Sequence, residues 1–113
     1  MRDTGSVTAE VAVAMTGVVL LLGGVLGAAA VAATHVRVGD AAGAGARAAA
    51  RGDAPAAVLA TTRRVAGPGA EADVTRSGDL LTVRASAPVR VPLVGTPVLV
   101  VRASASALVE VPP

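Results

Sequence analysis

The hydrophobic pattern divides the chain into an apolar N-terminal part and a patterned C-terminal part. No charged residue lies between Glu10 and His35, and residues 11–34 offer no polar face in a helix. A bilayer core about 30 Å thick is crossed by about 20 apolar residues in a helix, and a helix in lipid is apolar all round. The stretch therefore predicts a membrane-spanning helix. It is longer than the roughly 7–15-residue apolar region of a secretory signal.

The next stretch, residues 35–51, keeps its helical character but becomes polar. Alanine dominates it, with arginine and aspartate interspersed. We expect one helix from about Ser6 to Arg51, with a transmembrane part over residues 6–34 and a polar continuation over 35–51. Glycine weakens a helix by roughly 1 kcal/mol relative to alanine, so we expect bending or fraying in the continuation. The glycines concerned are Gly39, Gly43 and Gly45.

A second, short helix follows. Gly52 is expected to end the first helix, Asp53 to cap the second, and Pro55 to suit its first turn. This helix is predicted over residues 55–65, and the Gly-Pro-Gly sequence at 67–69 stops it.

Beyond residue 70 the hydrophobic period changes to two, which indicates strands with one face in water. Such stretches cover residues 71–76, 80–91 and 98–111. Pro88 cannot donate to a sheet ladder, so we expect it to lie beyond the end of the first strand. The strands form a three-stranded antiparallel meander whose apolar face needs a cover. Only the short helix and the polar part of the long helix are candidates for that cover.

The predicted fold class is therefore α+β. A long N-terminal transmembrane helix continues into a soluble part, and one short helix and the three-stranded antiparallel meander follow, with residues 52–113 as the small domain. Burial stabilises by about 25 cal/mol per Å² of apolar area, against an entropy cost of about 1.5 kcal/mol per ordered residue. A core built from alanine and valine has little margin. We expect the chain to depend on a membrane, a partner or an assembly.

The composition excludes several functions. The chain has no cysteine and no aromatic residue, and all ten basic residues are arginine. The lack of cysteine excludes disulfides and zinc–thiolate sites, and the lack of aromatic residues removes the stacking platforms that bind single-stranded nucleic acid. The net charge is only +2, and acidic residues separate the arginines, so no basic patch for nucleic acid is visible.

Two features that enzymes use are present but weak. His35 lies where the apolar segment ends, which suits an interfacial residue better than an oriented catalytic one. Residues 43–48 match G-x-G-x-x-A, but no strand precedes them and no acidic residue follows at the distance that ribose binding needs. We expect no enzymatic activity, no metal and no cofactor.

Two glycines in the apolar segment are spaced for helix packing. Gly23 and Gly27 form a G-x-x-x-G pair, which lets two membrane helices approach closely. Glycine is also common in membrane helices in general, so a packing role and simple composition are both open.

Glu10 is the only charge in the otherwise apolar start of the helix. A carboxylate costs about 2.5–3.5 kcal/mol at the membrane centre and less near the edge. Glu10 either extends towards water at the membrane edge or has a specific partner. Glu10 is the fifth residue after Gly5, which Ser6 follows directly. This spacing bears on whether Glu10 has a specific partner.

These residues resemble the class III signal of type IV pilins and pseudopilins. The family has a short charged leader, a glycine, a glutamate five residues later and then the apolar helix, which correspond here to residues 1–5, Gly5, Glu10 and 11–34. The sequence GSVTAEVAVA is similar to TadE-like minor pilins of tight-adherence (Flp-type) systems in high-G+C bacteria. Ser6 stands where major pilins commonly have phenylalanine, which favours a minor subunit.

The resemblance implies a structural protein made as a single-span precursor. A prepilin peptidase would cut after Gly5, Ser6 would become the N-terminus, and Glu10 would meet the N-terminal amine of a neighbouring subunit. The implied partners are this peptidase, other pilin or pseudopilin subunits, Tad-type assembly proteins and the membrane, without a cofactor.

The resemblance also implies a topology. The N-terminus would be cytoplasmic before cleavage, with the domain extracytoplasmic, at the pilus or the cell surface. The positive-inside rule alone favours the reverse, because more arginines follow the apolar segment than precede it. Acidic residues lie among the following arginines, and we keep the topology that the peptidase site implies.

Two other functions are open. One is an uncleaved single-span envelope protein whose small domain binds a partner. The other is a domain secreted after ordinary signal-peptidase cleavage near residues 28–30 or 32–33. The length of the apolar segment and the spacing of Gly5 and Glu10 argue against the second.

Overall fold

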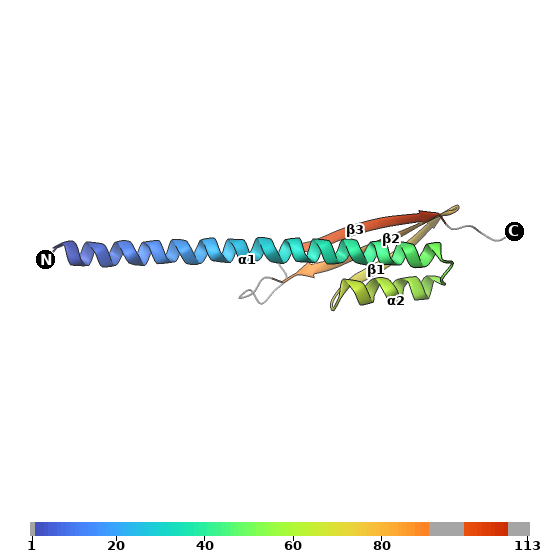
Figure 1. Ribbon diagram of the computed structural model, residues 1–113, viewed down its shortest axis with the longest axis horizontal. Coiled ribbons are helices and arrows are strands. Elements are labelled where there is room, and N and C mark those ends of the chain that lie inside the picture. Colours follow the sequence, from blue (N-terminus) through green and yellow to red (C-terminus); the bar gives the residue numbers. More distant parts are fainter. Residues whose placement is uncertain (1, 91–98, 109–113) are drawn as a thin grey trace.

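The computed structural model describes residues 2–90 and 99–108. Five elements follow one another: α1 (Arg2–Ala50), α2 (Pro55–Ala66), β1 (Glu71–Ser77), β2 (Leu80–Val89) and β3 (Leu99–Leu108). The molecule is a rod with extents of 90 × 20 × 17 Å, in which α1 projects far beyond a small domain built on its C-terminal part (Figure 1). The predicted α+β class is confirmed.

The helix α1 runs without interruption for 49 residues and begins at Arg2, earlier than the predicted start at Ser6. The expected fraying at its glycines is wrong, since the helix continues through all of them. Packing explains this result, because α2 and the sheet hold the polar part of α1 from two sides (Figure 1). Most helical stability in proteins comes from such tertiary contacts, which here outweigh the low propensity of glycine.

Gly52 ends α1 as expected. Its φ of 87° is in the left-handed region, where glycine has no steric penalty. The Gly52 N–H donates to the Ala49 carbonyl oxygen at 3.0 Å, and the Asp53 N–H donates to the Ala48 carbonyl oxygen at 3.1 Å. These two bonds form a Schellman motif, which satisfies carbonyls that the helix end would otherwise leave unpaired.

The prediction that Asp53 caps α2 is wrong. The N-cap is Ala54, and no side chain caps the helix. Pro55 is the first residue of α2, and its fixed φ suits that position, so the cap falls on the residue directly before it. The Asp53 carboxylate instead accepts a hydrogen bond from the Arg51 guanidinium at 3.2 Å, in an exposed ion pair.

The sheet has the predicted meander topology, with strand order β1-β2-β3 and both pairs antiparallel. The β1 pairing ends where Glu71 faces Ser86, so Pro88 lies beyond the first strand as predicted, opposite Val100 of β3. The predicted strand ends at residues 91, 98 and 109–111 lie outside the described residues.

The two helices cover one face of the sheet, which confirms the predicted arrangement (Figure 1). Alternate residues of β2 are buried beneath them: Leu81, Val83, Ala85, Ala87 and Val89. Two clusters form the core. One joins Val38 and its neighbours on α1 to Ala85 and Ala87, and the other joins Ala48, Ala49 and Val58 to Leu81 and Val83. Because these side chains are small, the helices lie close to the sheet.

Among the glycines whose surroundings are described, Gly45 of α1 has the closest neighbours. A Cβ atom placed there would collide with the Thr62 hydroxyl of α2 and lie 2.8 Å from a Val83 methyl carbon. Thr62 and Val83 are fully buried, and the Thr62 hydroxyl donates to the Val58 carbonyl oxygen at 2.8 Å. Gly45 therefore lets α1, α2 and β2 meet at one point.

Candidate functional site

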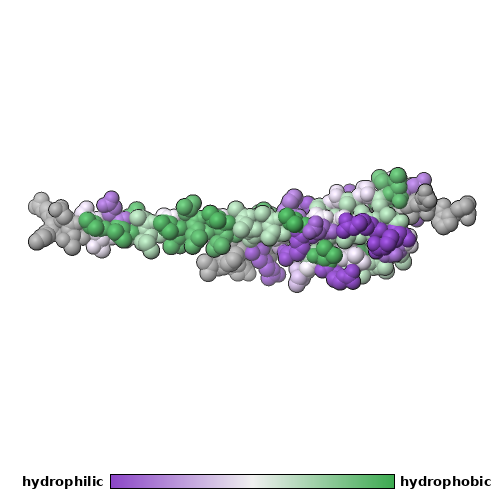
Figure 2. Space-filling model, viewed as in Figure 1, coloured by the Kyte–Doolittle hydropathy of each residue, from purple (hydrophilic) through white to green (hydrophobic). Residues whose placement is uncertain are grey.

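The part of α1 that precedes the domain, residues 5–33, contains no buried residue. We call this free-standing part the apolar rod. Within the described residues, α1 is the one helix long and apolar enough to cross a membrane, and none of its most apolar stretch is buried. Large apolar side chains are exposed throughout this stretch, and Figure 2 shows them gathered on the part of α1 outside the domain. Apolar surface of this extent marks an interaction with a membrane or with other proteins.

The three residues predicted for processing and assembly lie at the start of this rod. Gly5, Ser6 and Glu10 are all exposed, and the Gly5–Ser6 bond lies within the helix. Ser6 and Glu10 are four residues apart, so the helix brings them to one face. A Cβ atom at Gly5 would meet nothing within 4 Å.

The glycine pair predicted for helix packing lies further along the same rod. Gly23 and Gly27 are four residues apart, about one turn of α1. Gly23 is exposed, and a Cβ atom there would meet nothing within 4 Å, whereas Gly27 is half-buried. The flank of Gly23 is therefore open to the approach of a second helix.

The features considered for enzymatic activity do not come together. His35 is exposed on α1, whereas its neighbour Thr34 is buried and donates a hydrogen bond to the Ala30 carbonyl oxygen at 2.8 Å. Residues 43–48 lie inside α1 rather than at a strand-to-helix turn. In the parts of the chain that the structure describes, no three carboxylate or imidazole groups are placed as metal ligands.

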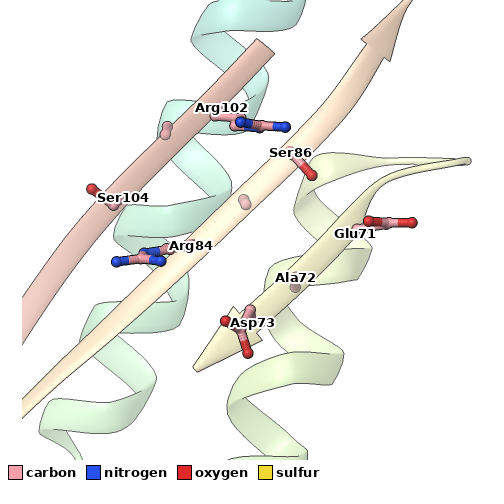
Figure 3. Close-up of a pocket in the computed structure, with 9 residues that line it drawn as sticks. Glu71, Ala72, Asp73, Arg84, Ser86, Arg102 and Ser104 are labelled. Carbon is pink, nitrogen blue, oxygen red and sulfur yellow. The ribbon is translucent and has the colours of Figure 1, made fainter. Parts of the chain in front are cut away.

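The outer face of the sheet, opposite the helices, is polar and ordered in rows. Glu71 of β1 faces Ser86 of β2, and Asp73 faces Arg84. Across the second pair, Ser86 faces Arg102 of β3, and Arg84 faces Ser104. These residues line an open depression of about 540 Å³, with its carboxylates on β1 and its arginines on β2 and β3 (Figure 3).

The next row towards the β1–β2 turn carries hydroxyl groups. The side-chain oxygens of Thr82 and Ser106 are 3.1 Å apart and share a hydrogen bond. The alternating pattern predicts that all these residues face outwards. The strand register places Asp73 opposite Arg84 and puts Glu71 in one row with Ser86 and Arg102. It was not predicted, because alternation does not reveal which residues face each other.

The fold and this surface define a class of protein: a small α+β domain attached to a helix long and apolar enough to span a membrane. Comparison with protein-family models, curated proteins and solved structures finds no match to this chain.

Proposed function

We propose that the protein is a TadE-like minor pilin, a structural subunit that is cut after Gly5 and assembled into or at the base of a Tad-type pilus. The observation that carries the proposal is the free-standing apolar part of α1, with Gly5, Ser6 and Glu10 at its start and a small domain at its far end. This arrangement suits a subunit that is stored in a membrane and then packed beside other apolar helices.

The position of Gly5 within a helix supports its role in processing. Glycine destabilises a helix by roughly 0.5–1 kcal/mol relative to alanine, so α1 unwinds more easily here than at its alanine positions. The exposed flank of Gly5 leaves the peptide bond accessible to a peptidase in the membrane. Cleavage would remove the leader and leave a charged α-amino group on Ser6 at neutral pH.

The spacing of Ser6 and Glu10 supports a role in assembly. The new amine and the carboxylate lie on one face of α1, and neither charge is easily buried alone in lipid. When two parallel helices are staggered by about one turn, the amine of one meets the carboxylate of the next. A buried pair of opposite charges is tolerated where lone charges are not, so Glu10 would select this stagger.

The outer sheet face favours a second function, that of an uncleaved single-span protein with a partner-binding domain. Its rows of carboxylates and arginines offer a polar partner both signs of charge. The two functions differ in the N-terminus of the membrane-bound protein.

Protein extracted from its native membranes is expected to begin at Ser6, because the peptidase would have removed the leader. Intact mass measurement and N-terminal sequencing read this directly. A chain that still begins at Met1 would favour the uncleaved envelope protein. A start near residue 31 or 34 would indicate a secreted domain.

Gly5→Val is expected to leave the precursor uncut in the membrane, because the branched side chain obstructs the scissile bond. Gly17→Val is the matched control, since Gly17 is also exposed on α1 with nothing within 4 Å. It places the same substitution on the same helix away from the proposed cut. Immunoblotting of membranes separates precursor from mature chain, and normal maturation of Gly5→Val would refute the assigned site.

A further inference from the structure

A groove lies at the end of the domain from which the apolar rod of α1 projects. It has a volume of about 590 Å³ and lies between α1, the turn before β1 and the end of β2. Its lining includes Ala30, Ala33 and Arg37 of α1, together with Gly69, Pro88 and Arg90. Along α1, the two alanines lie at the end of the apolar rod, and Arg37 lies beyond it.

Both arginines lie against glycine backbone. A Cβ atom at Gly67 would be 3.6 Å from Cδ of Arg37, and one at Gly69 would be 3.9 Å from a guanidinium nitrogen of Arg90. These glycines have φ values of 92° and 78°, which disfavour any side chain there. The turn that carries both glycines thus lies beside both arginine side chains.

Neither guanidinium has a carboxylate partner among the described residues. Arg37 and Arg90 are both exposed. The ion pair found among the described residues joins Arg51 to Asp53, away from the groove. Two such guanidinium groups in the lining of one groove offer positive charge to an anion. Guanidinium binds both carboxylates and phosphates through two parallel hydrogen bonds. The position of the groove beside the apolar rod favours the phosphate of a lipid.

The position of the groove along α1, relative to the membrane, indicates the source of that phosphate. With Glu10 at one boundary of a core about 30 Å thick and a rise of 1.5 Å per residue, the other boundary falls near Ala30. The Cα atom of Arg37 is then about 10 Å further out. Helical side chains tilt towards the N-terminus, so the long Arg37 side chain reaches back into the headgroup layer.

We propose that this groove binds the headgroup of an anionic phospholipid. Arg37 and Arg90 hold the phosphate, and the wall of Ala30 and Ala33 continues into the apolar rod and accommodates the start of an acyl chain. The site fixes the height of the domain above the bilayer. The inference rests on the membrane-spanning helix of the proposed function but not on cleavage or on pilus assembly.

Native mass spectrometry of the full chain in zwitterionic detergent tests the site. Phosphatidylglycerol is expected to bind about thirtyfold more tightly than phosphatidylcholine, because two arginines near an anionic headgroup together contribute about 2 kcal/mol. Arg37→Gln with Arg90→Gln should abolish this preference. Arg47→Gln is the control, because Arg47 is an exposed arginine further along the same helix, and it should retain the preference.

Three results with the lipids would overturn the proposal: equal binding of the two lipids by the unaltered chain, an unchanged preference in the double variant, and an equal loss in Arg47→Gln. A fourth would come from competition with a soluble phosphate ester. Soluble glycerol phosphate is added as a competitor, to distinguish a lipid from a free phosphate ester as the ligand. If it displaces phosphatidylglycerol at a concentration similar to that of the lipid, the lipid assignment is refuted. The same spectra give the chain mass, so lipid binding by a chain that begins at Met1 would overturn the pilin function alone.

Discussion

Glu10→Gln is expected to insert and be cleaved like the unaltered protein but to fail in assembly. Removing a charge from the apolar segment eases insertion, and the cut after Gly5 does not involve the carboxylate. Glutamine keeps the shape of the side chain and loses its charge. Once the helices pack together, the amine of the neighbouring Ser6 would be buried without a counter-charge, and losing one partner of a buried pair costs roughly 3–5 kcal/mol.

Crosslinking of the mature chain to pilus partners measures this effect. Glu10→Gln and Glu10→Ala should both give far fewer crosslinks than the unaltered protein. Glu71→Gln is the matched control, because it makes the same change at an exposed glutamate of β1 outside the rod, and it should crosslink normally. A carboxylate that merely extends to water predicts equal crosslinking in all of them, and that outcome would exclude the pairing role.

Gly45→Ala is expected to destabilise the domain by about 2 kcal/mol. Alanine is the better helix former by about 1 kcal/mol, but its methyl group would collide with the buried Thr62 hydroxyl and crowd Val83. Overpacking a rigid core costs about 1–3 kcal/mol, occasionally more, and this contact is closer than real Cβ atoms make. The cost therefore exceeds the gain in propensity.

Hydrogen exchange of the buried β2 amides measures this loss, because the rod dominates the helical signal of the whole chain. Gly39→Ala is the control: nothing lies within 4 Å of its added methyl, so the change should stabilise by up to about 1 kcal/mol. Adding Thr62→Ala to Gly45→Ala removes the colliding oxygen and should recover part of the loss. If Gly45→Ala and Gly39→Ala changed the stability of the domain equally, the close approach of Thr62 and Val83 to Gly45 would be refuted.

Much of the candidate site was predicted because it is local. The apolar rod and the shared helix face of Ser6 and Glu10 follow from residues close together in the chain. The same holds for the inward and outward faces of β2 and for the end of α1 at Gly52. Helical and strand periods act over a few residues, so a single sequence carries them.

The wrong predictions have one physical cause. The fraying expected at Gly45 reflects the propensity of an isolated helix, whereas α2 and β2 pack against that glycine and hold the helix there. The cap expected at Asp53 reflects its side chain alone, whereas Pro55 places the cap at Ala54, and the Asp53 N–H completes the end of α1. In both cases a neighbouring element competed with the local preference and won.

The sequence by itself determined the rod, the order of the elements, the α+β class and the apolar face of the sheet, because each depends on hydrophobic periodicity or on a glycine or proline at one position. Only the tertiary structure decided the close approach at Gly45, the rows of charge on the outer sheet face and the placement of Arg37 and Arg90 in the lining of one groove. Those contacts join residues far apart in the chain. Their geometry is set by how closely small side chains let the helices and the sheet pack, a distance that no local pattern encodes.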